Sequence, residues 1–165
     1  MCQWANGSVR KCRHERRQFD DALFICHTGA MHPVYVAQKA VLVREDGRIL
    51  ALRRSKTDQN RPLTWDLPGG DVEFGEDLTE SIKREVREEA GIEVKDLTLL
   101  DAIGRVTPQN EYWVSLGYFA RVPQDTEVTV SWEHDQYEWL TREEFLARES
   151  SSRIKRFLEN VPIER

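Results

Sequence analysis

Apolar residues gather in several segments of the chain, and short polar stretches separate these segments. Val34–Val43 is rich in apolar residues that partly alternate with polar ones, and Arg48–Arg54 follows it after the turn Glu45–Gly47. This pattern predicts a hairpin. Leu97–Val106 and Tyr112–Val122 predict two further strands joined by a polar loop. Shorter strands are predicted at Asp71–Phe74 and Tyr137–Leu140.

A four-residue apolar spacing marks the segment between two of these strands as a helix. Its apolar face is predicted to consist of Leu78, Ile82, Val86 and Ala90. Asp77, with Glu80 three residues later, predicts the N-cap, and Gly91 predicts the end of the helix.

The C-terminal part of the chain predicts two shorter helices. Thr141 and Glu144 have the spacing of a capping box, which opens a helix that ends near Arg148. A final helix is predicted from apolar spacings of three and four residues, at Ile154, Phe157 and Leu158. Strands interspersed with few helices predict an α/β fold in which a mixed β-sheet is packed between helices.

The polar face of the longest predicted helix carries an unusual charge pattern. Glu85, Glu88 and Glu89 fall within an arc of roughly 100° on the helix. Like charges this close repel one another, and Glu89 falls inside or beside the apolar face, where burial of a bare carboxylate is costly. A bound divalent cation offsets both costs, and oxygen-only ligands suit Mg²⁺ or Mn²⁺.

The same glutamates belong to a longer pattern. Nine residues over a span of 23 match a fixed spacing: Gly70, Glu76, Arg84, Glu85, Val86, Glu88, Glu89, Gly91 and Ile92. This spacing resembles the signature of the Nudix hydrolase family, to which MutT-like proteins belong, and the preceding Leu67–Gly70 resembles the family's usual lead-in. The resemblance covers roughly residues 35–145 and implies the Nudix α/β/α sandwich.

The resemblance also implies roles for individual residues. Metal ligation is implied for Glu85, Glu88, Glu89 and the backbone carbonyl of Gly70. Glu76 and Arg84 are implied to form a structural ion pair that orients the helix. A cation held by carboxylates binds phosphate oxygens, neutralises charge in the transition state and lowers the pKa of a coordinated water. The implied activity is hydrolysis of a diphosphate bond in a nucleoside diphosphate derivative.

The general base is harder to place from the sequence. Glu85 is the first choice, and the loop before the last strand offers Glu133, with His134 and Asp135 behind it. That loop resembles a region where relatives place an additional metal ligand or base. The alternative is that all three are ordinary polar loop residues. The candidate catalytic set is therefore Glu85, Glu88, Glu89 and Glu133.

The substrate is only partly constrained. The compact chain and the lead-in Trp65–Gly70 resemble small family members that act on nucleoside triphosphates. Against this, Pro108 lies 16 residues after Ile92, a spacing that resembles a marker of the ADP-ribose-cleaving branch. Six aromatic residues could either line a slot for the nucleobase or pack in the core: Trp65, Phe74, Tyr112, Trp113, Tyr118 and Phe119. We expect a nucleoside triphosphate or nucleotide pyrophosphohydrolase, with an ADP-ribose or nucleotide-sugar pyrophosphatase as the alternative.

The sequence disfavours two other classes of protein. A non-catalytic nucleotide-binding module is disfavoured because every carboxylate of the motif is intact. Isomerisation of a prenyl diphosphate, which relatives of this fold perform, is implied to need a cysteine in the domain, and residues 31–165 contain none.

Length, composition and charge narrow the partners. The 165 residues fit a single domain with a tail, and 39% hydrophobic with 32% charged residues is typical of a globular protein. The formal charge of −5 divides into +2 for residues 1–30 and −7 for the rest. An acidic body argues against a nucleic-acid polymer as partner. No apolar run approaches the roughly 20 residues that span a bilayer, and no signal peptide is visible. We therefore expect a cytoplasmic protein acting on a small nucleotide.

The first 30 residues differ from the rest of the chain. They contain all of its cysteines, Cys2, Cys12 and Cys26. An odd count without a secretion signal argues against a disulfide framework. A zinc site built from Cys12, His14, Cys26 and His27 matches no common zinc module. We expect residues 1–30 to be a poorly ordered N-terminal extension and residues 31–165 to form the domain.

Overall fold

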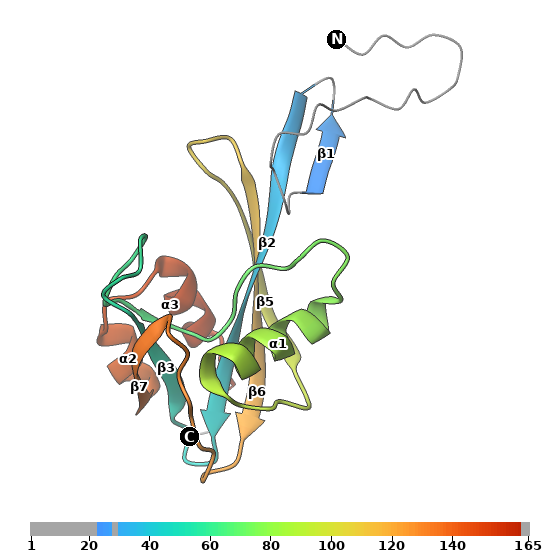
Figure 1. The fold of residues 1–165 in the computed structure, drawn as a ribbon. Coiled ribbons are helices and arrows are strands. Elements are labelled where there is room, and N and C mark those ends of the chain that lie inside the picture. Colours follow the sequence, from blue (N-terminus) through green and yellow to red (C-terminus); the bar gives the residue numbers. More distant parts are fainter. Residues whose placement is uncertain (1–22, 28–29, 163–165) are drawn as a thin grey trace, which may run out of the picture.

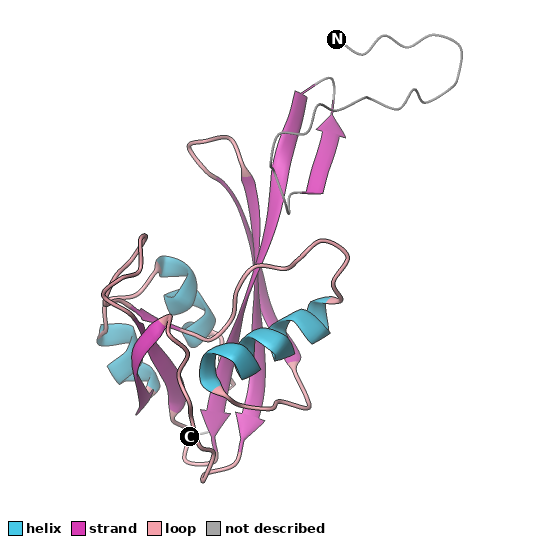
Figure 2. Cartoon of the chain, viewed as in Figure 1, coloured by secondary structure: helices cyan, strands magenta, loops and turns pink. Residues whose placement is uncertain are grey.

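A computed structural model of the chain describes residues 23–27 and 30–162 (Figures 1 and 2). The strands form a 7-stranded sheet whose main path runs in the order β4-β3-β2-β6-β5, with β1 paired to β2 and β7 paired to β3. The strands are β1 (Leu23–His27), β2 (Ala30–Arg44), β3 (Ile49–Arg54), β4 (Trp65–Asp66), β5 (Thr98–Val106), β6 (Tyr112–Val122) and β7 (His134–Leu140). The helices are α1 (Leu78–Ala90), α2 (Arg142–Ala147) and α3 (Ser152–Glu159).

The sheet is mixed because its two longest strands run parallel. β2 pairs with β6 in parallel from Val34 opposite Tyr112 to Arg44 opposite Val122. β5 is antiparallel to β6, and β3 is antiparallel to both β4 and β7. The predicted hairpin between β2 and β3 is present but short: Val43 lies opposite Ile49, and Arg44 N donates to the carbonyl of Arg48 (2.9 Å) beside the turn.

The glycine-containing segment before α1 explains why that hairpin is short. It occupies the free edge of β2, where Gln38 N donates to the carbonyl of Gly70 (2.7 Å) and Ala40 N donates to the carbonyl of Pro68 (2.9 Å). Asp71 forms an isolated bridge with Ala37. The strand predicted at Asp71–Phe74 is reduced to this single bridge, and the segment instead ties the start of the candidate motif to the middle of the sheet.

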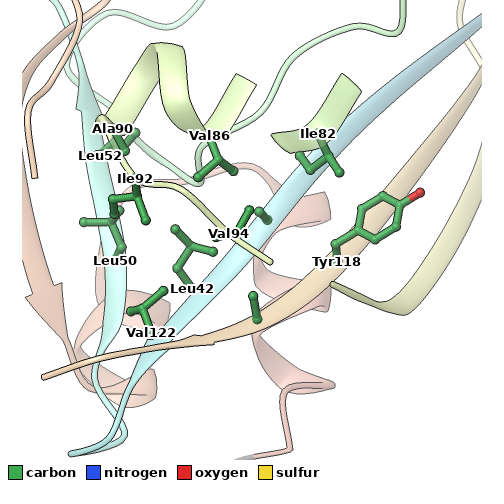
Figure 3. Close-up of a cluster of buried hydrophobic side chains, with 12 residues drawn as sticks. Leu42, Leu50, Leu52, Ile82, Val86, Ala90, Ile92, Val94, Tyr118 and Val122 are labelled. Carbon is green, nitrogen blue, oxygen red and sulfur yellow. The ribbon is translucent and has the colours of Figure 1, made fainter. Parts of the chain in front are cut away.

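Helices cover both faces of the sheet, as Figure 1 shows. α1 packs on one face, where Ile82, Val86 and Ala90 join a buried cluster with residues of β2, β3 and β6 (Figure 3). α2 and α3 pack on the other face through Phe145, Phe157 and their neighbours. The predicted α/β fold, a mixed sheet between helices, is confirmed. Leu78 is the exception on the predicted apolar face, because the first turn of α1 leaves it 43% exposed.

The helix ends are where the sequence predicted them. The Asp77 side chain accepts from the backbone N–H groups of Thr79 (2.9 Å) and Glu80 (3.2 Å), which caps α1. Gly91 ends the helix with φ of 69°, a conformation that glycine adopts without a steric penalty. Thr141 and Glu144 form the predicted capping box of α2.

The sheet begins before the predicted domain start at Met31. Leu23–His27 forms β1, which pairs antiparallel with Ala30–Val34. Residues 1–22 and 28–29 of the predicted extension, with Cys2, Cys12 and His14, lie outside the described residues, so the zinc alternative stays untested. None of the helices in the described ranges has the length and apolar content that crossing a bilayer requires.

Candidate active site

A cleft of about 1020 Å³ lies between the carboxylate face of α1 and the strands β2, β5 and β6. It brings together four of the residues that the sequence singled out: Gly70, Glu85, Glu89 and Glu133. Glu88 does not line the cleft and is exposed. The cleft is also lined by six cationic side chains, Lys39, Arg54, Arg61, Arg105, Arg153 and Arg156.

Glu89 is the most buried carboxylate of the predicted metal set, with 6% of the residue exposed. It lies between the apolar residues of α1 and the segment before the helix, and its Oε2 accepts from the backbone N–H of Gly69 at 2.8 Å. Burial raises the pKa of Glu89 to about 7, against the opposing charge of Lys39. A carboxylate kept at this cost in an otherwise apolar layer points to a charged ligand.

Glu85 lies one turn earlier on α1, half-buried above the glycine pair. Burial raises its pKa, while a hydrogen bond from Arg84 Nη1 to Oε1 (2.8 Å) opposes that shift. A Cβ at Gly70 would lie only 2.6 Å from Glu85 Oε2, so any side chain at this position would displace the Glu85 carboxylate. The carbonyl of Gly70, predicted as a metal ligand, accepts from Gln38 N, and its role toward a metal stays a prediction.

Arg84 and Glu76 form the ion pair that the motif implied. Arg84 donates from Nε and Nη2 to the two oxygens of Glu76, at 2.8 and 3.0 Å. This paired hydrogen bond lowers the pKa of Glu76 to about 2. Arg84 Nη1 also contacts Glu88 Oε2 at 3.1 Å, so one guanidinium holds three carboxylates in place on and beside α1.

The structure separates the three candidate residues near the start of β7, where Glu133 precedes the strand and His134 and Asp135 are its first residues. Glu133 lines the cleft, held by the hydrogen bond from Ser55 N to its carbonyl (2.8 Å). Asp135 is exposed and accepts from Arg53 Nε at 2.7 Å. His134 is 4% exposed, burial lowers its pKa to about 4, and neither of its ring nitrogens has a hydrogen-bond partner in the described part of the chain. Only Glu133 is therefore placed to act on a substrate in the cleft.

Lys39 and Asp66 are part of the site, and the sequence analysis missed both. Lys39 on β2 is 5% exposed, and its Nζ donates to the carbonyls of Leu67 (2.8 Å) and Gly69 (2.6 Å). It also lies 3.3 Å from Asp66 Oδ2, and Asp66 is 1% exposed. The signal was a lysine inside an apolar strand, since charged residues are rarely buried without a partner.

The aromatic candidates divide between core and cleft. Trp65 and Tyr118 are buried, whereas Phe74 is 81% exposed. Trp113 lines the cleft, stacks on Tyr35 with ring centroids 4.6 Å apart, and donates from Nε1 to Glu111 Oε2 at 3.1 Å. Of the aromatic residues named from the sequence, Trp113 is the one that the cleft exposes to a ligand.

The donor set fits a hard divalent cation, although the carboxylates are not arranged as a finished cage. Glu85 and Glu89 face one cleft, both have pKa values raised by burial, and both offer only oxygen. Within the described ranges, no three His, Cys, Asp or Glu side chains form a ready-made metal site. Arg84 donates to Oε1 of Glu85 and Gly69 N donates to Oε2 of Glu89, so a cation could bind the second oxygen of each carboxylate.

We expect the pH dependence of metal-free stability to differ between wild type and Glu89→Gln. The pKa of Glu89 rises from 4.5 to about 7, so its stabilisation is full below pH 4.5 and is lost as the pH rises through about 7. The difference amounts to about 3 kcal/mol in the free energy of unfolding. His134 has a pKa lowered to about 4, so it stabilises the fold more as the pH rises, and it does so equally in both proteins.

Urea unfolding in EDTA at about pH 5 and about pH 8.5 measures this difference. Glutamine keeps the hydrogen bond to Gly69 N and stays neutral, so the variant is expected to be more stable than wild type at the higher pH. If the free energy of unfolding changed equally with pH in both proteins, the raised pKa of Glu89 would be contradicted.

Several known proteins are similar to this chain in sequence. The family model of the NUDIX domain matches residues 34–161. A MutT-like protein of Streptomyces ambofaciens is 36% identical over 118 residues, covering 72% of this chain and 70% of that protein. The nucleoside triphosphatase NudI of Escherichia coli is 30% identical over 114 residues, covering 64% of this chain and 81% of NudI.

The fold is also similar to solved structures. The crystal structure of a MutT NUDIX hydrolase from Burkholderia pseudomallei matches with a TM-score of 0.66 and 30% identity, covering 78% of this chain and 98% of that one. The matched range on this chain contains the cleft and every residue of the carboxylate motif.

Proposed function

The chain belongs to the Nudix hydrolase family and is a hydrolase acting on phosphoanhydride bonds, and on that premise we propose that it hydrolyses nucleoside triphosphates with a divalent cation as its cofactor. The observation that carries the proposal is the burial of Glu89 beside Glu85 at one end of a cleft lined by cationic side chains. Carboxylates at one end call for a cation, and guanidinium groups at the other suit phosphate.

Residues of α1 would hold the cation. Glu85 and Glu89 would bind it from within the cleft, and Glu88 from its outer edge after release from Arg84. The cation, Mg²⁺ or Mn²⁺, supplies positive charge for phosphate oxygens and makes a water more acidic. Gly70 permits the approach of Glu85, and the Arg84–Glu76 pair fixes the orientation of the helix.

Glu85 is proposed as the base that takes the proton of the attacking water, and Glu133 is the other carboxylate of suitable placement. Both line the cleft, and burial raises the pKa of Glu85, which favours proton uptake. We expect Glu85→Gln to abolish the acidic limb of the pH profile of kcat, and Glu133→Gln to keep that limb while lowering kcat. If instead Glu133→Gln abolished the acidic limb and Glu85→Gln kept it, Glu133 would be identified as the base.

A nucleoside triphosphate is the substrate best supported by this chain. It resembles a nucleoside triphosphatase over most of that protein's length, and two arginines that line the cleft, Arg105 and Arg153, have no ion pair within the described residues and suit a further phosphate group. Trp113 provides an aromatic surface in the same cleft for a base.

A substrate panel tests the proposal. The purified chain would be given nucleoside triphosphates, nucleoside diphosphates, ADP-ribose and nucleotide sugars, with Mg²⁺, with Mn²⁺ or with EDTA, and the phosphate, diphosphate and nucleoside monophosphate products would be identified. We expect triphosphates to be cleaved to a monophosphate and diphosphate, and EDTA to abolish the activity. Preferred cleavage of ADP-ribose would replace the substrate assignment, and undiminished activity in EDTA would contradict the cofactor.

A further inference from the structure

The cations that line the cleft differ in how closely carboxylates pair with them. Asp66 is 1% exposed and lies within ion-pair distance of three cations: Lys39 at 3.3 Å, Arg54 at 3.0 Å and Arg61 at 3.9 Å. Arg54 has a second carboxylate partner, Asp58. Arg61 has only the longest of these contacts, to a carboxylate that two other cations already share.

Arg153 and Arg105 are less well balanced still. Arg153 on α3 donates from Nη1 to Ser115 Oγ at 3.2 Å, and no carboxylate pairs with it or with Arg105 within the residues that the structure describes. Burial lowers the pKa of Arg153, and the like charges of Arg61 and Arg105 add to this effect. Arg61, Arg105 and Arg153 therefore line one cleft and repel one another, an effect on Arg153 that the attraction of Asp66 and Asp71 opposes.

The strand register places these groups together. Arg105 on β5 lies opposite Trp113 on β6, and Ile103 lies opposite Ser115, so all four side chains are on one face of the sheet. Arg153 reaches Ser115 on that face from α3. Ser151 and Ser152, at the N-terminus of α3, also line the cleft, and the N-terminus of a helix favours an anion.

The distance from this cluster to the carboxylates is bridged by one residue. Asp66 interacts electrostatically with Glu89 and also with Arg153. A ligand in the cleft can therefore contact the carboxylate end and the guanidinium end at once. A ligand with phosphate groups in both places would suit the cleft, because an anion offsets the repulsion among the arginines.

We propose that Arg61, Arg105 and Arg153, with the N-terminus of α3, form an anion subsite for a phosphoryl group that the divalent cation does not hold. This inference rests on the proposed function and specifies its substrate class. The phosphoryl group belongs either to a triphosphate chain or to a phosphate monoester on the nucleoside. Diphosphate-linked sugars without a further phosphate leave the subsite unfilled.

Binding in the absence of metal tests the subsite separately from catalysis. Isothermal titration calorimetry of the full chain in EDTA would use inorganic tripolyphosphate and, separately, adenosine 2′-monophosphate. We expect tripolyphosphate to bind, and Arg153→Gln and Arg105→Ala each to weaken its Kd by about tenfold or more. The matched control is Arg121→Ala, an exposed arginine on β6 outside the cleft, which is expected to bind as wild type does.

The outcomes are distinct. Arginine-dependent binding of tripolyphosphate assigns the subsite to a phosphate chain, and arginine-dependent binding of the nucleoside monophosphate alone assigns it to a monoester. No binding by wild type, or equal binding by all variants, overturns the subsite. Arg105→Ala keeps the test valid if Arg153→Gln unfolds, because Arg105 is exposed.

Failure of the subsite and failure of the proposed function remain distinguishable. Glu89→Gln, which is expected to be inactive, should still bind tripolyphosphate in EDTA, since its substitution is at the opposite end of the cleft. A chain that hydrolyses triphosphates but binds neither tripolyphosphate nor adenosine 2′-monophosphate would refute the subsite alone. A chain that binds tripolyphosphate and hydrolyses no nucleotide would refute the function alone.

Discussion

Glu89→Gln is expected to lower kcat/KM for the preferred nucleotide by about a thousandfold, or about 4 kcal/mol of transition-state stabilisation. The substitution removes one negative charge from a buried position, 6% exposed, where a divalent cation would bind. The fold is expected to survive because glutamine has the same shape and accepts the same hydrogen bond from Gly69 N. Initial rates at saturating Mg²⁺, with the melting temperature of each protein, measure both effects.

The control for this prediction is Glu80→Gln on the same helix. Glu80 is exposed, pairs with Lys83 at 3.1 Å and does not line the cleft, so its variant should retain wild-type activity. Glu88→Gln is informative beside it, since Glu88 is exposed and outside the cleft lining. Full activity of Glu89→Gln would disprove the metal site, whereas full activity of Glu88→Gln alone would restrict that site to Glu85 and Glu89.

Lys39→Met is expected to reduce both stability and activity. The free energy of unfolding should fall by about 2–4 kcal/mol, because the variant leaves two buried carbonyls unpaired and removes one cation from the buried Asp66. The lost hydrogen bonds are those that hold the segment containing Gly69 and Gly70 in place. Since the Lys39 charge also opposes the raised pKa of Glu89, metal binding should require a higher pH in the variant.

Two measurements separate these effects. Urea unfolding gives the stability, and the gain in melting temperature on adding Mg²⁺, followed across pH, gives the second effect. If Lys39 had only a structural role, its substitution would lower the free energy of unfolding and leave the pH midpoint of the Mg²⁺-induced gain in melting temperature unchanged. Lys95→Met, at an exposed position after α1, is the matched control, with an expected change within about 0.5 kcal/mol.

Features that depend on near neighbours in the chain were predictable. The caps at Asp77 and Gly91, the buried face of α1 and the Arg84–Glu76 pair all follow from spacings of a few residues on a regular helix. The burial of Glu89 followed from the same periodicity. In each case the helix geometry alone decides which side chains meet.

The β-sheet was only partly predictable. Alternation identified the strands at Tyr112–Val122 and near Val34–Val43, but it does not specify which strand lies beside which. The hairpin between β2 and β3 was therefore the natural expectation. In the structure, β6 takes one edge of β2 and the glycine-containing segment takes the other.

The sequence by itself determined the family, the carboxylate helix and the chemistry that its glutamates favour. Only the tertiary structure decided that Lys39 and Asp66 complete the carboxylate end, that Glu133 enters the cleft while Glu88 stays outside it, and that Arg153 meets Ser115 across 38 residues of chain. The physical reason is that a helix sets its contacts through a local repeat. A cleft between layers depends on how distant elements pack, and no short stretch of chain encodes that arrangement.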